Sequence, residues 1–162
     1  MRDVDYCGDP KEVEVFEGAA AALGQLKARG YKIIMITNQS GIGRGYFDES
    51  AYREVEKEVV RQLGAGVIDA TYFCPHSSEQ TCACRKPAPG MVLQAAQDHA
   101  IHLARSYFIG DKDSDVECGR RAGTKTILLS TGYGKSAKQD APDAVAGDLP
   151  AAVRFILDRA ND

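Results

Sequence analysis

A short segment rich in cysteine and histidine constrains the structure of this chain more than any other part of the sequence. Cys74, His76, Cys82 and Cys84 lie within the eleven residues 74–84. Three thiolates and one imidazole form the ligand set of a closed tetrahedral zinc site. Cys74 and His76 are two residues apart, and so are Cys82 and Cys84. Both ligands of each pair can therefore point the same way from an extended or tightly turned segment. Residues 74–84 are therefore predicted to form a loop held by a structural zinc ion.

The predicted zinc loop ends directly before Arg85 and Lys86. A structural zinc ion contributes folding free energy, so it would order this polar loop and fix both positive charges at its exit. Two other interpretations remain open: a loop of unrelated polar or reactive side chains, and a disulfide. The sequence shows neither a signal peptide nor a transmembrane run, which indicates a reducing cytoplasmic compartment where disulfides are disfavoured.

Length and composition indicate one ordinary globular domain over residues 1–162. The chain is 44% hydrophobic and 27% charged, with a net charge of −3 and a pI near 5.6. No basic stripe is present, so a nucleic acid is not an expected partner. A membrane partner is not expected either, and the chain is expected to be a monomer. Cys7 and Cys118 stand apart from the other cysteines and are interpreted as small, semi-buried side chains.

Helical and strand patterns alternate along the chain. The apolar, isoleucine-rich run at 31–37 is typical of a strand buried on both faces. The alternation predicts an α/β fold with a parallel sheet that helices cover on both faces. The expected helices span residues 19–29, 48–63, 89–99, 113–122 and 149–159, and the expected strands span 31–37, 70–74, 106–110 and 125–129.

Polar residues follow the strand at 31–37. Thr37, Asn38, Gln39 and Ser40 offer a hydroxyl and a run of backbone N–H groups that could bind a phosphate. In parallel sheets, ligands bind beyond the carboxyl ends of the strands, where this segment lies. A plain turn after a strand is the alternative interpretation.

The run Gly-Asp-Lys-Asp-Ser-Asp at 110–115 follows the strand at 106–110. Its carboxylates suit Mg²⁺, which takes one or two carboxylates and keeps several waters. Asp113 or Ser114 is also expected to cap the following helix. Arg85 and Lys86 would add fixed positive charge to such a site, or would form a solvated surface pair.

Taken together, these segments resemble a known superfamily. Thr37-Asn38-Gln39, Lys86 and Gly110-Asp111-x-x-x-Asp115 are similar to the second, third and fourth motifs of the haloacid dehalogenase superfamily. The Cys-x-His…Cys-x-Cys-Arg-Lys-Pro segment resembles its histidinol-phosphate phosphatase branch. The resemblance implies a Rossmann-like, three-layer phosphomonoesterase with a small zinc loop, no large cap domain, a magnesium cofactor and an aspartyl-phosphate intermediate.

The resemblance also implies a role for each matching residue. Thr37 would hydrogen-bond the transferring phosphoryl group and Lys86 would offset its charge, while Asp111 would bind magnesium. The segment at 3–6 matches the family's short substrate-contacting loop. The implied zinc ligands are Cys74, His76, Cys82 and Cys84, and the implied substrate-binding residues are Asp3, Val4, Asp5, Tyr6, Thr37, Asn38, Gln39, Ser40, Arg85, Lys86 and Lys112.

One departure from the family concerns its first motif, an apolar strand ending in Asp-x-Asp-Gly-Thr that carries the nucleophile and the general acid. No such segment occurs in residues 1–162, and Asp3-Val4-Asp5-Tyr6 fits the place just after it. A start site assigned to an internal Met would explain this, as would a shortened chain or a real loss. The first central strand, expected between 31–37 and 106–110, would then be absent. Residues 1–162 alone are expected to lack the nucleophile and to fold poorly.

The resemblance implies hydrolysis of the 7-phosphate of D-glycero-D-manno-heptose 1,7-bisphosphate, a small phosphorylated sugar. Histidinol phosphate is the alternative substrate, and Arg44 and Arg85 slightly favour a substrate with a second phosphate. Two other classes of function remain: a catalytically inactive relative that binds phosphorylated sugars or a protein, and a zinc-containing interaction module.

Overall fold

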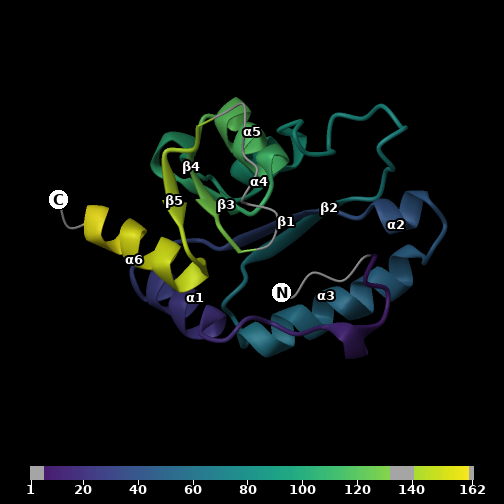
Figure 1. Cartoon of the computed structure of the whole chain (residues 1–162), viewed down its shortest axis with the longest axis horizontal. Helices are drawn as coiled ribbons and strands as arrows, with labels where there is room; N and C mark the ends of the chain where they lie inside the picture. The colour runs from purple at the N-terminus through teal and green to yellow at the C-terminus, as the bar shows by residue number, and fades with distance from the viewer. Residues whose placement is uncertain (1–5, 132–140, 161–162) are drawn as a thin grey trace. The chain divides into compact units, whose positions relative to one another are not determined.

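The computed structural model describes residues 6–131 and 141–160, and the chain divides into two compact units, Met1–Cys82 and Ala83–Asp162 (Figure 1). Each unit contains parallel strands and the helices that pack on them, so the expected α/β fold with parallel pairing is confirmed. Among the described residues, no helix is both long enough and apolar enough to cross a membrane.

The first unit contains a two-stranded parallel sheet of β1 and β2, in which Ile34 lies opposite Ala70 and Asn38 lies opposite Cys74. Its helices α1 and α3 contact each other (Figure 1). The elements are the 3₁₀ turn η1 (Pro10–Glu12), α1 (Ala19–Ala28), β1 (Ile34–Asn38), α2 (Ser40–Gly43), α3 (Glu49–Leu63) and β2 (Ala70–Cys74).

The long helix α3 forms much of the core of the first unit. It begins after Asp48, whose side chain accepts a 2.8 Å hydrogen bond from Ala51 N–H, as expected for a capping aspartate. Its apolar residues recur every three or four positions, so they share one face of the helix and are buried. These residues are Tyr52, Val55, Val59 and Leu63.

The strand β1 begins later than the sequence predicts, at Ile34 instead of Tyr31. Gly30 has a left-handed φ of 80°, and Tyr31 N–H donates to Leu26 C=O at the end of α1. This is the hydrogen-bond pattern of a glycine-terminated helix, and it withdraws Tyr31 from the strand. Every residue of β1 is half-buried, so the expected burial on both faces is wrong for this strand within its unit.

The second unit contains a three-stranded parallel sheet in the order β3-β4-β5. The middle strand β4 is the most deeply buried, and both α5 and α6 contact it (Figure 1). The elements are α4 (Gly90–Asp98), the 3₁₀ turn η2 (Leu103–Arg105), β3 (Tyr107–Gly110), α5 (Asp113–Ala122), β4 (Lys125–Leu129), β5 (Ala144–Ala146) and α6 (Leu149–Arg159).

The bounds of β2, α5, β4 and α6 agree with those predicted, whereas β5 was not predicted. At three residues, β5 is too short for an alternating pattern to be read from sequence. Among the described residues, β1 pairs with β2 and β3 pairs with β4, and no ladder joins β1 to β3. These ladders do not test the first central strand that the family resemblance implies. The strand itself stays a prediction.

A carboxylate ties β5 to β4 in the second unit. Thr126 is almost fully buried, and both its N–H and its hydroxyl donate to Asp143 Oδ2, at 2.7 and 2.9 Å. The hydrogen bonds from the backbone and then the side chain of Thr126 lower the pKa of Asp143 below its ordinary value. A carboxyl with a lowered pKa stabilises the fold above its unfolded-state pKa and loses that contribution as the pH falls through its folded-state pKa.

We therefore predict that Asp143→Ala lowers the free energy of unfolding by about 1–3 kcal/mol at neutral pH, because two buried groups of Thr126 lose their acceptor. Asp143→Asn keeps one acceptor oxygen but cannot ionise, so its deficit should be smaller and should vanish in acid. Urea unfolding of the full-length protein between about pH 7 and pH 3 measures both effects. Equal stability of Asp143→Ala and the wild type at pH 7 would contradict this account.

Candidate active site and metal centre

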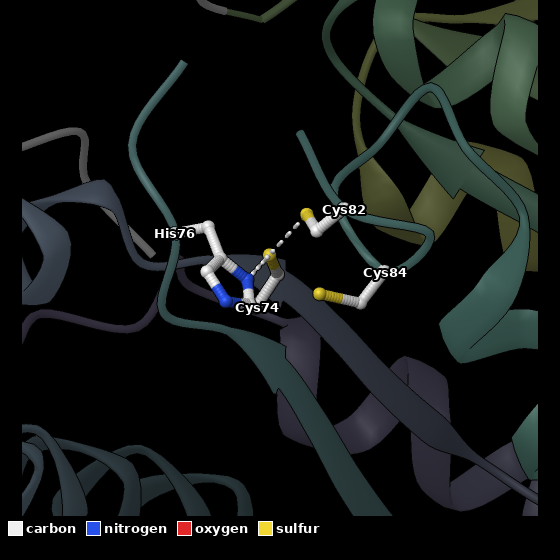
Figure 2. A group of neighbouring side chains, drawn as sticks. All are labelled: Cys74, His76, Cys82 and Cys84. Carbon is white, nitrogen blue, oxygen red and sulfur yellow. Dashed lines mark hydrogen bonds between the residues drawn. The ribbon is translucent and has the colours of Figure 1, made fainter. Parts of the chain in front are cut away.

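The four predicted metal ligands converge in the structure. The candidate ligand atoms of Cys74, His76, Cys82 and Cys84 all lie within 4.8 Å of one another. Figure 2 shows the three sulfur atoms and the imidazole ring facing a common centre. Cys74 Sγ lies 3.4 Å from His76 Nδ1 and 3.6 Å from Cys82 Sγ. The cluster joins the end of β2 to the segment that leads into α4.

The spacing of this cluster fits zinc. Zn–S and Zn–N bonds of about 2.3 and 2.0 Å in a tetrahedron put two sulfurs about 3.8 Å apart and a sulfur and a nitrogen about 3.5 Å apart. The distances from Cys74 Sγ to His76 Nδ1 and to Cys82 Sγ lie near these values. All five cysteines are free thiols, so the disulfide interpretation is wrong.

Close backbone contacts fix the loop that carries the cluster. A Cβ atom at Gly43 of α2 would lie 2.6 Å from Ser77 N and 2.7 Å from Pro75 O, so only a glycine fits there. Ser77 N–H also donates to Gln80 Oε1 at 2.8 Å. The turn after β1 and the first half of the metal loop therefore lie against each other.

The residues that follow β1 are linked to the same loop. Gln39 N–H donates to Cys74 C=O at 2.7 Å, and Gln39 Nε2 donates to Thr37 Oγ1 at 3.1 Å. Asn38 is the last residue of β1, and Ser40 begins α2. The predicted phosphate-binding turn thus starts at the carboxyl end of a parallel strand and is joined to the first metal ligand by one backbone hydrogen bond.

In the second unit, Lys86 and Asp115 form a buried ion pair. Lys86 Nζ lies 2.6 Å from Asp115 Oδ1, with side chains 13% and 7% exposed. Asp115 Oδ2 accepts hydrogen bonds from the N–H groups of Asp111 and Lys112, both at 3.2 Å. A Cβ atom at Gly110 would lie 2.3 Å from Asp115 Cβ, which explains the glycine before Asp111. One carboxylate therefore holds both the lysine and the backbone that follows β3.

Asp115 is the site residue that sequence reasoning did not single out. It lies in the fourth motif, but its contact with Lys86 joins residues far apart in sequence. The N-cap prediction for Asp113 or Ser114 is wrong, because α5 begins at Asp113 and Lys112 precedes it as the cap residue. Asp115, at the third position of α5, accepts from the Lys112 N–H and so satisfies the helix end itself.

The other candidate residues have different surroundings. Asp111 and Arg85 are half-buried, whereas Lys112 and Tyr6 are exposed. Asp3, Val4 and Asp5 lie outside the described residues. The predicted substrate-binding turn at 37–40 belongs to the first unit, and Lys86, Asp111 and Lys112 belong to the second. Their expected approach to one another therefore stays a prediction.

The two remaining cysteines are packing residues. Cys118 is completely buried, and its thiol donates to Ala88 C=O at 3.5 Å. Burial raises the pKa of Cys118 to about 11 and also raises that of Cys7. Both thiols are therefore protonated near neutral pH and unreactive.

Comparison with known proteins defines the class of this chain. A protein-family model for HAD-hydrolase-like proteins matches residues 83–152. The fold is similar to a crystal structure of a D,D-heptose 1,7-bisphosphate phosphatase from B. bronchiseptica, which was complexed with magnesium and phosphate. The two chains have a TM-score of 0.90 and 31% sequence identity, and the match covers 98% of this chain and 92% of that one. The fold is that of a HAD-like phosphatase.

Curated relatives narrow the class to a family. A D-glycero-beta-D-manno-heptose-1,7-bisphosphate 7-phosphatase of Helicobacter pylori (strain J99) is 41% identical over 133 residues, which are 80% of this chain and 76% of that protein. The enzyme of the same name from Pasteurella multocida is 37% identical over 166 residues, 94% of this chain and 90% of that protein. The chain belongs to the family of these heptose-bisphosphate phosphatases.

We predict that the full-length protein prepared without chelators contains one zinc ion per chain, and that Cys82→Ser removes it. Loss of a protein-supplied ligand should loosen the loop and lower phosphatase activity indirectly. Metal analysis and thermal unfolding measure the two effects, and Cys118→Ser serves as a control that changes a cysteine but keeps the zinc. Zinc-free wild-type protein would contradict the assignment.

We also predict strong coupling between Lys86 and Asp115. Removal of one partner, as in Asp115→Asn or Lys86→Met, leaves a buried charge and should cost about 3–5 kcal/mol of folding stability, with a double variant less destabilised than the sum. The exposed pair Lys57–Glu54, at 2.6 Å, is the control and should couple by less than about 1 kcal/mol. Double-mutant cycles in urea test both, and additive effects at Lys86 and Asp115 would contradict the buried pair.

Proposed function

We propose that this protein removes the 7-phosphate from D-glycero-D-manno-heptose 1,7-bisphosphate. The observation that carries the proposal is the ion pair of Lys86 with Asp115, directly after the metal cluster. A buried lysine held by a carboxylate is a fixed positive charge, and phosphoryl transfer depends on positioning and charge neutralisation more than on covalent chemistry by the protein. The names of the relatives supply the substrate.

The candidate residues suit the separate tasks of phosphoryl transfer. The Thr37 hydroxyl would donate to a phosphoryl oxygen, and the ammonium group of Lys86 would offset the charge on that group. Asp111 fits a magnesium ion, because its carboxylate is half-buried beyond a strand end and Mg²⁺ takes one or two carboxylates. When bound, magnesium would neutralise part of the phosphoryl charge.

Zinc has a structural role in this proposal. Cys74, His76, Cys82 and Cys84 would fill all four positions around a tetrahedral zinc ion, so no position would be open for substrate or water. The ion would hold the chain just before Arg85 and Lys86 and so would fix the direction in which both cations leave the loop. Its effect on catalysis would be through these two side chains.

The remaining candidates would bind the rest of the substrate. Asn38, Gln39 and Ser40 follow Thr37 at the end of β1. Arg85 and Lys112 supply further positive charge beside Lys86 and Asp111. The proposed substrate-binding residues are Asp3, Val4, Asp5, Tyr6, Thr37, Asn38, Gln39, Ser40, Arg85, Lys86 and Lys112.

Steady-state kinetics with the purified protein test the proposal. We expect kcat/KM for D-glycero-D-manno-heptose 1,7-bisphosphate to exceed that for histidinol phosphate by at least about a hundredfold, because a site that pairs with a second phosphate rejects a substrate lacking it. Treatment with EDTA should abolish turnover, and added Mg²⁺ should restore it. A higher kcat/KM for histidinol phosphate would reverse the substrate assignment, and a lack of turnover of both would refute the phosphatase proposal.

A further inference from the structure

An exposed cluster in the first unit is not explained by folding. Tyr6, Arg44 and Tyr46, here called the aromatic–arginine platform, gather at the surface although they come from two separate segments. The rings of Tyr6 and Tyr46 lie edge to face with centroids 4.9 Å apart, and the guanidinium carbon of Arg44 lies 5.9 Å from the Tyr6 centroid. The two tyrosines are 46% and 61% exposed, among the most exposed large apolar side chains that the structure describes.

The backbone of α2 places Arg44 and Tyr46 on the same turn. Gly45 has a left-handed φ of 73°. Its N–H donates to Ile42 C=O, and Tyr46 N–H donates to Gly41 C=O at 2.9 Å. These two hydrogen bonds form the Schellman motif that ends a helix and fixes the direction of the residues on either side of the glycine.

Phe47 joins this turn to the segment that carries Tyr6. A Cβ atom at Gly8 would lie 2.8 Å from the Phe47 ring, and one at Gly41 would lie 2.4 Å from it. The ring is therefore in contact with both glycines. The Tyr6 segment and the α2 turn are fixed to each other by this contact, so the platform is not a chance overlap of two loose loops.

Local strain accompanies this arrangement. Tyr6 has a φ of 55°, a left-handed conformation that is uncommon for a bulky residue. Such conformations cost free energy and tend to occur at functional sites. Burial of apolar surface does not offset this free-energy cost, because the Tyr6 ring remains exposed.

The platform lies one short helix beyond the proposed phosphate-binding turn. Helix α2 has four residues, from Ser40 to Gly43, so it advances by about 6 Å between that turn and Arg44. This advance along the helix is comparable to the length of a sugar ring. Arg44 also donates to Ser78 Oγ at 3.3 Å, a contact that connects the guanidinium group to the metal loop.

We propose that the platform recognises the part of the sugar bisphosphate that does not react. Arg44 hydrogen-bonds the second phosphate, for which its planar guanidinium group is suited. The rings of Tyr6 and Tyr46 contact the sugar, since a tyrosine offers an apolar face and a polar tip. Arg44 and Tyr46 are then specificity-determining residues. This inference rests on the proposed function.

Two substrates that differ only in the second phosphate test the role of Arg44: heptose 1,7-bisphosphate and heptose 7-phosphate. The preference of the wild-type enzyme is the ratio of its kcat/KM values for the two. We expect Arg44→Gln to lower this ratio by about tenfold to a hundredfold, as for the loss of a hydrogen bond to a charged group. Arg44→Lys, which keeps the charge but loses the planar fork, should give an intermediate ratio.

Matched variants separate recognition from folding. Arg61 is a highly exposed arginine of α3 with its own partner Glu58, so Arg61→Gln should leave the ratio unchanged. Tyr46→Ser should raise KM for both sugars, and Tyr46→Phe should restore most of the affinity. If Arg44→Gln leaves the ratio unchanged, or lowers both kcat/KM values equally, the platform inference is wrong while the phosphatase proposal stands. If the wild type hydrolyses neither sugar, the proposed function fails, and the inference fails with it.

Discussion

The convergence of four side chains at the Cys/His cluster determines how the functional segments are connected. Cys74 ends β2, and its carbonyl accepts the N–H of Gln39, two residues after Thr37. Beyond Cys84 the chain continues directly into Arg85 and Lys86. A polar loop of this length has little apolar surface to stabilise it, so metal coordination is the force that can order it.

A second constraint acts inside the second unit, where one carboxylate has three partners. Asp115 pairs with Lys86, caps the start of α5 through the Lys112 N–H, and accepts the Asp111 N–H. Gly110 leaves the space that this carboxylate occupies. Buried charges persist where they are paired and hydrogen-bonded, so each partner of Asp115 depends on the others. The interactions of Asp115 that stabilise this unit therefore also fix the position of its candidate catalytic lysine.

Much of this could be predicted from the sequence, and the exceptions have physical causes. The metal ligands were predictable because the four residues lie close in sequence and form a recognised ligand set. Helix α5 and strand β4 were predictable from their apolar periodicity and the glycine that ends the helix. The contact of Lys86 with Asp115 could not be predicted, because it depends on tertiary packing between segments that are distant in sequence. The platform was missed for the same reason, since Tyr6 and Tyr46 meet through the Phe47 contact with two glycines.

The charge balance at Lys86 explains why one lysine does not suffice for binding a phosphate. Its ammonium group is already paired with Asp115 at 2.6 Å, so the pair is close to neutral when viewed from a distance. A phosphate carries up to two negative charges, and bringing it to a neutral, partly buried pair would be unfavourable without further cations. In the proposed site Arg85 and Lys112 would supply two positive charges, and a magnesium ion at Asp111 would supply two more. The paired lysine can then act through its fixed position, while the surrounding cations provide most of the net attraction.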